Sequence, residues 1–81
     1  MLECFFDKKT ECLAIHVKGR FDYSCYKAFK EAFSIAEKAK SYEVDLAQVS
    51  YLDSSALGML LLLRDHAGGD KALIRLTGVN D

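Results

Sequence analysis

The residues best placed to do chemistry are two adjacent serines, Ser54 and Ser55, which directly follow Asp53. This triplet separates a short run rich in Val and Leu, typical of a strand, from the leucine-dense run Ala56 to Leu63, typical of a helix. The serines therefore lie at a predicted helix N-terminus, where unpaired backbone N–H groups and a partial charge of about +0.5 favour anions. A hydroxyl at such a point can cap the helix, act as a nucleophile or carry a phosphate.

Helix capping accounts for only one of these three polar side chains. Asp53 and Ser54 are both suitable N-caps, because aspartate and serine oxygens accept hydrogen bonds from the first backbone N–H groups of a helix. The second serine exceeds what capping needs. Ser55 is therefore the candidate for a further role.

The sequence gives little support for catalysis or for a bound cofactor. The serines lack the Gly-x-Ser-x-Gly elbow of hydrolases, and the chain has no glycine-rich nucleotide-binding motif. His16 has no second ligand at metal-binding spacing, so we assign it no role. The odd number of cysteines, without Cys-x-x-Cys spacing, argues against disulfides and structural zinc. We expect no catalytic residue, no metal site and no cofactor.

Length and composition indicate one small domain, residues 1–81, with 51% hydrophobic residues and a net charge of −1. Lys and Arg are dispersed, so the sequence indicates no basic surface for nucleic acid. The longest apolar run, Ala56 to Leu63, is far shorter than the roughly 20 residues that cross a bilayer. We therefore expect a cytoplasmic protein with reduced cysteines that binds neither nucleic acid nor a membrane.

A β-hairpin is predicted at the start of the chain. The segments Leu2 to Phe6 and Glu11 to Lys18 have the pattern of two strands, and the second has apolar residues at every other position. The polar residues between them suit a turn, although no glycine defines its type. We expect Cys4 to lie opposite residues near Leu13 or Ala14 and not opposite Cys12.

The first helix is predicted to begin at Asp22, a good N-cap that follows a break in the alternation at Gly19-Arg20-Phe21. Apolar residues then recur at intervals of three and four, which predicts an amphipathic helix packed on a sheet. These residues are Tyr26, Phe29, Phe33 and Ala36, with Cys25, Ala32 and Ala39 alongside. Ser41 and Tyr42 are expected to close the helix.

Two further strands are predicted, from Val44 to Val49 and from Ala72 to Leu76, which gives the element order β-β-α-β-α-β. A strand, a helix and a strand in succession form a right-handed crossover, so the strands before and after the first helix should be parallel. The two helix starts then emerge at the same edge of the sheet, where Asp22 and Ser55 can approach each other.

Two motifs resemble those of a known family. The first resembles the signature of STAS domains, and specifically of bacterial anti-sigma factor antagonists; it consists of Asp45-Leu46 and Val49-Ser50-Tyr51-Leu52-Asp53-Ser54-Ser55-Ala56-Leu57-Gly58. The second, Gly19-Arg20-Phe21-Asp22, resembles the family's Gly-x-x-Asp turn, whose acidic residue lies close to the serine loop. Ser55 falls at the position that the anti-sigma kinase phosphorylates in this family. Ala56 departs mildly from it, because glycine is common at that position.

The resemblance implies an α/β fold, a STAS-like mixed sheet of about four strands with helices packed on it. It also implies a function: the unphosphorylated protein binds a histidine-kinase-like anti-sigma factor and frees the sigma factor. That partner is also a serine kinase, and its phosphorylation of Ser55 ends the interaction. A PP2C-type phosphatase restores binding. The resemblance thus implies that the protein regulates transcription by partner switching. It also implies that the kinase, and not this chain, binds ATP.

The resemblance also implies which residues contact the partner. Asp22 and Asp53 help to dock it, Ser54 lies beside the phosphoacceptor, and Gly58 permits close approach. Met59 is a further candidate, because its flexible thioether adapts to a partner surface. Asp45, in a mainly apolar strand, is expected to be structural.

One alternative function remains open from the sequence. The same fold could act as an accessory subunit of a lipid or anion transporter, although the Asp-Ser-Ser triplet favours the phosphorylation switch. STAS domains usually continue with further helical segments, so we expect the chain to be short at its C-terminus. Apolar surface left open by that shortness could cause self-association.

Overall fold

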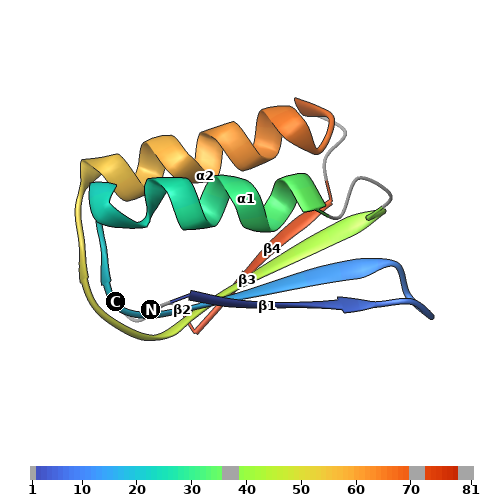
Figure 1. Ribbon diagram of the computed structural model, residues 1–81, viewed down its shortest axis with the longest axis horizontal. Coiled ribbons are helices and arrows are strands. Elements are labelled where there is room, and N and C mark those ends of the chain that lie inside the picture. Colours follow the sequence, from blue (N-terminus) through green and yellow to red (C-terminus); the bar gives the residue numbers. More distant parts are fainter. Residues whose placement is uncertain (1, 36–38, 70–72, 79–81) are drawn as a thin grey trace.

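Apolar residues at alternate positions of the strands give the sheet one apolar face. In the computed structural model, two helices cover this face (Figure 1). The structure describes residues 2–35, 39–69 and 73–78. The described elements, in chain order, are β1 (Leu2–Asp7), β2 (Cys12–Phe21), the 3-10 helix η1 (Tyr23–Cys25), α1 (Tyr26–Ile35), β3 (Ser41–Leu52), α2 (Ser54–His66) and β4 (Ile74–Thr77). The predicted element order is thus confirmed, with a short 3-10 turn added before the first helix.

The described strands form one four-stranded sheet in the order β1-β2-β3-β4. β1 is antiparallel to β2, whereas β3 is parallel to both β2 and β4. The helices α1 and α2 therefore connect parallel neighbours, and both lie on the same face of the sheet (Figure 1). This mixed sheet confirms the predicted α/β fold and the predicted parallel pairing across the first helix.

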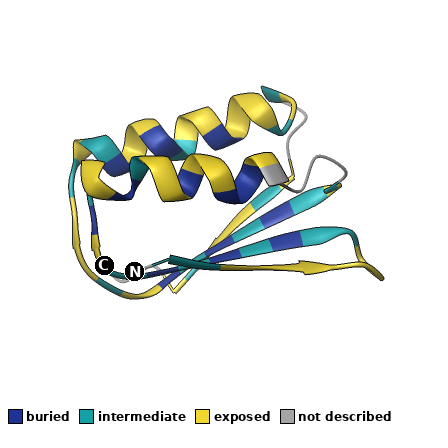
Figure 2. Ribbon diagram, in the orientation of Figure 1, coloured by how far each residue is buried: buried dark blue, intermediate teal, exposed yellow. Residues whose placement is uncertain are grey.

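The core lies between the sheet and the two helices (Figure 2). Alternate residues of β2 and β3 point into it, and each helix contributes one stripe of apolar side chains, because burial of apolar surface is the main force that holds the layers together. The large buried members are Leu13, Ile15, Val17, Phe21, Phe29, Phe33, Tyr42, Val44, Leu46, Met59 and Leu63.

The hairpin register agrees with the predicted one. Cys4 pairs with Ile15, the neighbour of Ala14, and not with Cys12, which pairs with Asp7. The turn takes four residues after Asp7, and Glu11 adopts a left-handed conformation with φ of 56°. A residue other than glycine rarely adopts this conformation, which explains why Glu11 was predicted in the second strand and not in the turn.

Both parallel strands extend further than predicted. β2 continues through Gly19-Arg20-Phe21, because Gly19 adopts φ of 80° and the pairing with β3 shifts register there while the strand goes on. Ser41 and Tyr42 begin β3 and do not close the helix, since Tyr42 pairs with both Leu13 and Ile74 and is buried. The predicted helix residue Ala36 lies outside the described residues.

The second helix is apolar on more than one side. Leu57, Leu61 and Leu62 are exposed, and an apolar groove between α2 and β4 is lined by Leu57, Leu60, Leu61, Ile74 and Leu76. Self-association through this surface stays a prediction. Among the described residues, no helix has the length and apolar character needed to cross a membrane.

Candidate functional site

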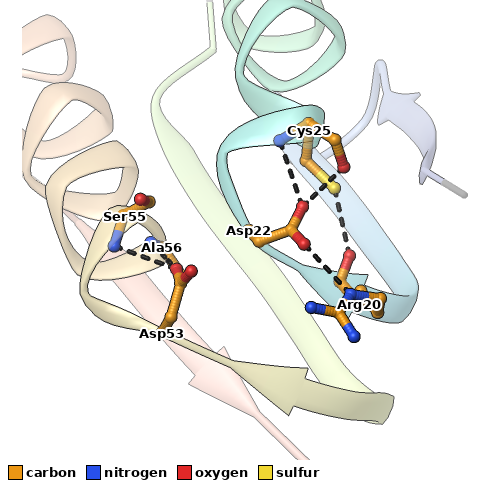
Figure 3. A network of polar contacts seen from close by, with 7 residues as sticks. Arg20, Asp22, Cys25, Asp53, Ser55 and Ala56 are labelled. Atoms are coloured by element: carbon orange, nitrogen blue, oxygen red, sulfur yellow. Dashed lines mark hydrogen bonds and ion pairs between the residues drawn. The ribbon is translucent and has the colours of Figure 1, made fainter.

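The two helix starts lie at one edge of the sheet because β2 and β3 are parallel and end together. Phe21 at the end of β2 pairs with Leu52 at the end of β3. The residue that directly follows each strand is the N-cap of the next helix: Asp22 after β2 and Asp53 after β3. Figure 3 shows these two acidic turns on neighbouring segments, with Ser55 on the first turn of α2. The predicted arrangement of the helix starts is confirmed.

Asp53, and not Ser54, is the cap of α2. Its Oδ1 accepts hydrogen bonds from the backbone N–H groups of Ser55 and Ala56, at 3.0 and 3.4 Å. In the described part of the chain, no hydrogen bond uses the hydroxyl of either serine. Ser54 is exposed and Ser55 is half-buried. The Asp53 carboxylate thus fills the capping role, and the Ser55 hydroxyl is not needed for it.

Asp53→Ala is expected to lower the free energy of unfolding by about 0.5–2 kcal/mol, because two N–H groups of α2 lose their acceptor. Urea denaturation followed by circular dichroism measures the loss. Asp53→Asn keeps an acceptor oxygen and should lose less, and Ser54→Ala should change stability little. A loss for Ser54→Ala as large as that for Asp53→Ala would contradict the assignment of the cap.

Asp22 is held in its ionised form by its own turn. It accepts hydrogen bonds from the hydroxyl and the backbone N–H of Ser24 and from Nε of Arg20, the last at 3.1 Å. The hydrogen bond from the Ser24 hydroxyl is the main cause that lowers the pKa of the Asp22 carboxyl below its usual value, and the hydrogen bond from Arg20 lowers it further. This carboxylate is therefore a fixed negative charge at the start of the first helical segment.

Arg20 and Tyr51 belong to the site, although the sequence analysis assigned neither of them a role. They are paired across β2 and β3, and the Arg20 guanidinium carbon lies 4.3 Å from the centre of the Tyr51 ring. Arg20 comes two residues before Asp22, and Tyr51 comes two residues before Asp53. The parallel register is the only signal that places them together.

Met59 cannot contact a partner in this fold. Its side chain is only 3% exposed, because it lies with Ala56 and Leu63 on the stripe of α2 that packs into the core. Leu57, on the first turn of α2 beside the serines, is exposed instead, at 56%. Gly58 is exposed, and a Cβ built there would meet no atom within 4 Å. Its role in close approach of a partner therefore stays a prediction, and the fold itself does not require glycine.

The other polar residues considered lie away from these helix starts. His16 Nδ1 is 3.3 Å from Asp45 Oδ2, and both residues alternate with the buried, core-facing positions of their strands. Asp45 also accepts a hydrogen bond from the N–H of Ala47, which agrees with a structural role. His66 lies at the far end of α2 from the serines and packs against Phe33. Within the described ranges, no group of three or more His, Cys, Asp or Glu residues could hold a metal ion.

Comparison with known proteins gives one family. The family described as "Mlab, STAS domain" matches residues 4–81. A "STAS-domain containing protein" of Pseudomonas aeruginosa is 54% identical over 65 residues, which are 79% of this chain and 64% of that protein. The chain thus spans slightly less than two thirds of this relative's length.

Solved structures that share the fold include the following three. The anti-sigma factor antagonist SpoIIAA in its unphosphorylated form matches 100% of this chain and 76% of its own, with a TM-score of 0.83 and 15% identity. An antisigma-factor antagonist STAS domain from Rhodobacter sphaeroides matches 96% and 85%, with a TM-score of 0.73 and 19% identity. A sulfate transporter family protein from Wolinella succinogenes matches 95% and 62%, with a TM-score of 0.74 and 15% identity. At these identities the matches show the fold alone.

Proposed function

The chain belongs to the STAS-domain family, and from that premise we propose that it is an anti-sigma factor antagonist switched by phosphorylation of Ser55. STAS domains are regulatory binding modules and not enzymes, so the role of the chain is binding. The proposal takes residues 1–81 as a single cytoplasmic domain. The observation that supports it is the Ser55 hydroxyl, which makes no hydrogen bond within the described residues and follows Asp53 at the sheet edge where both acidic helix caps lie.

The proposed partner is an anti-sigma factor that is also a serine kinase. The Ser55 oxygen attacks the γ-phosphorus of ATP held by the kinase, the bond to ADP breaks, and the hydroxyl proton passes to the kinase. A PP2C-type phosphatase reverses the change by adding water across the phosphate ester, which restores the hydroxyl and releases inorganic phosphate. Under this proposal the partner contacts four residues around the reacting oxygen: Asp22, Asp53, Ser54 and Gly58.

The charge of the phosphate explains why it ends binding. A phosphoserine carries about −1.5 to −2 charges at neutral pH. Asp53 already occupies the N–H groups of Ser55 and Ala56, so those donors do not neutralise the added charge. One neighbouring cation would leave part of this charge uncompensated, and burying an uncompensated charge at an interface costs on the order of 3–5 kcal/mol. Because each 1.4 kcal/mol is a factor of about ten in affinity, the phosphate weakens binding by roughly a hundredfold or more while the fold is kept.

Incubation with the cognate kinase and ATP tests the proposal directly. Intact mass spectrometry should show a gain of one phosphoryl group, and peptide mapping should place it on Ser55. Ser55→Ala should gain nothing, while the matched variant Ser54→Ala should be labelled as the wild type is. Labelling that survives in Ser55→Ala and disappears in Ser54→Ala would contradict the assignment.

An accessory subunit of a lipid or anion transporter is the second candidate, and the fold match to the sulfate transporter family protein favours it. This function requires constant binding to a membrane partner and no modified serine. Co-purification with a transporter that Ser55→Asp leaves unchanged, together with no labelling by any kinase, would favour the transporter role over the switch.

A further inference from the structure

The guanidinium of Arg20 is held at the edge of the sheet by two contacts. Its Nε lies 3.1 Å from Oδ2 of Asp22, and its carbon lies 4.3 Å from the centre of the Tyr51 ring. Tyr51 belongs to β3, the strand that leads into Asp53 and Ser55. The side chain therefore leans from β2 towards the segment that carries the serines (Figure 3).

These contacts leave the phosphate-binding end of the arginine open. In the described part of the chain, they use only Nε and the flat face of the guanidinium, so neither terminal nitrogen makes a polar contact. The Arg20 side chain is 66% exposed. The two terminal nitrogens of arginine donate in a fixed fork that matches the oxygens of a phosphate.

A phosphate on Ser55 needs such a donor. The first N–H groups of α2 already donate to Asp53, whose carboxylate also repels a second anion. Neighbouring strands lie only about 4.8 Å apart, and Arg20 already extends across that gap to the ring of Tyr51. Tyr51 comes four residues before Ser55, so Arg20 extends towards the segment that would carry the phosphate.

We infer that Arg20 is a positioning residue that binds the phosphoryl group of phosphorylated Ser55 and, in doing so, releases Asp22. The inference rests on the proposed phosphorylation of Ser55. A phosphate dianion attracts the guanidinium more strongly than a single carboxylate does. The chemical change at the start of α2 thereby removes the arginine partner of the Asp22 carboxylate at the start of η1, so that both halves of the partner-binding edge respond to one modification.

The test uses a chain with phosphoserine at position 55 made by chemical synthesis, with the ligation junction at Cys25. Phosphorus NMR then follows the second ionisation of the phosphate, which has a pKa of about 6 in an unstructured chain. An exposed ion pair with Arg20 should lower that pKa by roughly 0.2–0.7 unit relative to the Arg20→Gln variant. Arg20→Lys should keep part of the shift, because it keeps the charge but loses the fork.

Arg64→Gln is the matched control, since it removes the same charge from the last turn of α2. The phosphate pKa in this variant should equal that of the wild type. Equal phosphate pKa values in the wild type and in Arg20→Gln would overturn the inference.

A second readout does not depend on whether Arg20→Gln folds. In the wild-type chain, phosphorylation should move the Arg20 Nε–H resonance, and that resonance should titrate with the phosphate. A resonance that is the same with and without the phosphate would also overturn the inference. Because the phosphate is installed by synthesis, failure of every kinase to modify Ser55 would count against the proposed function alone.

Discussion

Phosphorylation of Ser55 is expected to weaken binding to the proposed anti-sigma partner by roughly a hundredfold or more. The Ser55→Asp variant should weaken it by at least about tenfold. Aspartate has the smaller effect because it carries one charge, whereas phosphoserine carries nearly two. Ser55→Ala should bind as tightly as the unmodified wild type and should stay competent in the presence of kinase and ATP. Titration calorimetry with the purified partner measures all of these affinities.

The position of the charge should matter as much as its sign. Ser34→Asp places the same charge on the exposed last turn of α1, away from the edge where Asp22 and Asp53 lie, and should leave the affinity unchanged. Equal affinities for Ser55→Ala and Ser55→Asp would contradict the charge mechanism. A loss for Ser34→Asp as large as that for Ser55→Asp would show that net charge, and not the site, controls binding.

The sequence predicted the two acidic caps well because capping is a local property. Aspartate before a helical pattern satisfies the first N–H groups with its own side chain, and no distant residue is needed for that contact. Asp22 fulfils this prediction, and the structure selects Asp53 from the two candidates, Asp53 and Ser54, that the sequence left open. The shared edge also followed from local patterns, since a strand, a helix and a strand in succession predict parallel strands.

Met59 shows what the pattern of α2 could not reveal. Leucine and methionine occupy nearly every side of this helix, so hydrophobic periodicity does not tell which side faces the sheet. Packing against the core buries Met59 and leaves Leu57 exposed. A helix with a clear polar face, such as α1, presents no such ambiguity, and its buried Phe29 and Phe33 were predicted from sequence alone.

The contact of Arg20 with Tyr51 also lay beyond prediction. It depends on the register between β2 and β3, and that register shifts twice, between His16 and Lys18 and between Gly19 and Arg20. A shift of one residue moves a side chain to the other face of a sheet. Sequence motifs name the residues of this edge, but only the pairing of the strands shows which of them touch.

Phe21→Ala is expected to lower the free energy of unfolding by about 3–5 kcal/mol, because it leaves a cavity in the core. Phe21 is 0% exposed, and its ring centre lies 5.5 Å from that of Phe29 on α1. A small domain has only about 5–15 kcal/mol of stability in total, so this loss brings it close to unfolding. Urea denaturation followed by circular dichroism measures the change.

Phe5→Ala is the matched control, because it removes the same ring from a position that is 59% exposed, and it should cost less than about 1 kcal/mol. The difference between the two variants also bears on function, because Phe21 lies next to the proposed site. It directly precedes Asp22 and pairs with Leu52, which directly precedes Asp53. Phe21→Leu should keep part of the packing and lose less stability than Phe21→Ala. Equal losses for Phe21→Ala and Phe5→Ala would mean that the edge carrying Ser55 does not depend on this buried ring.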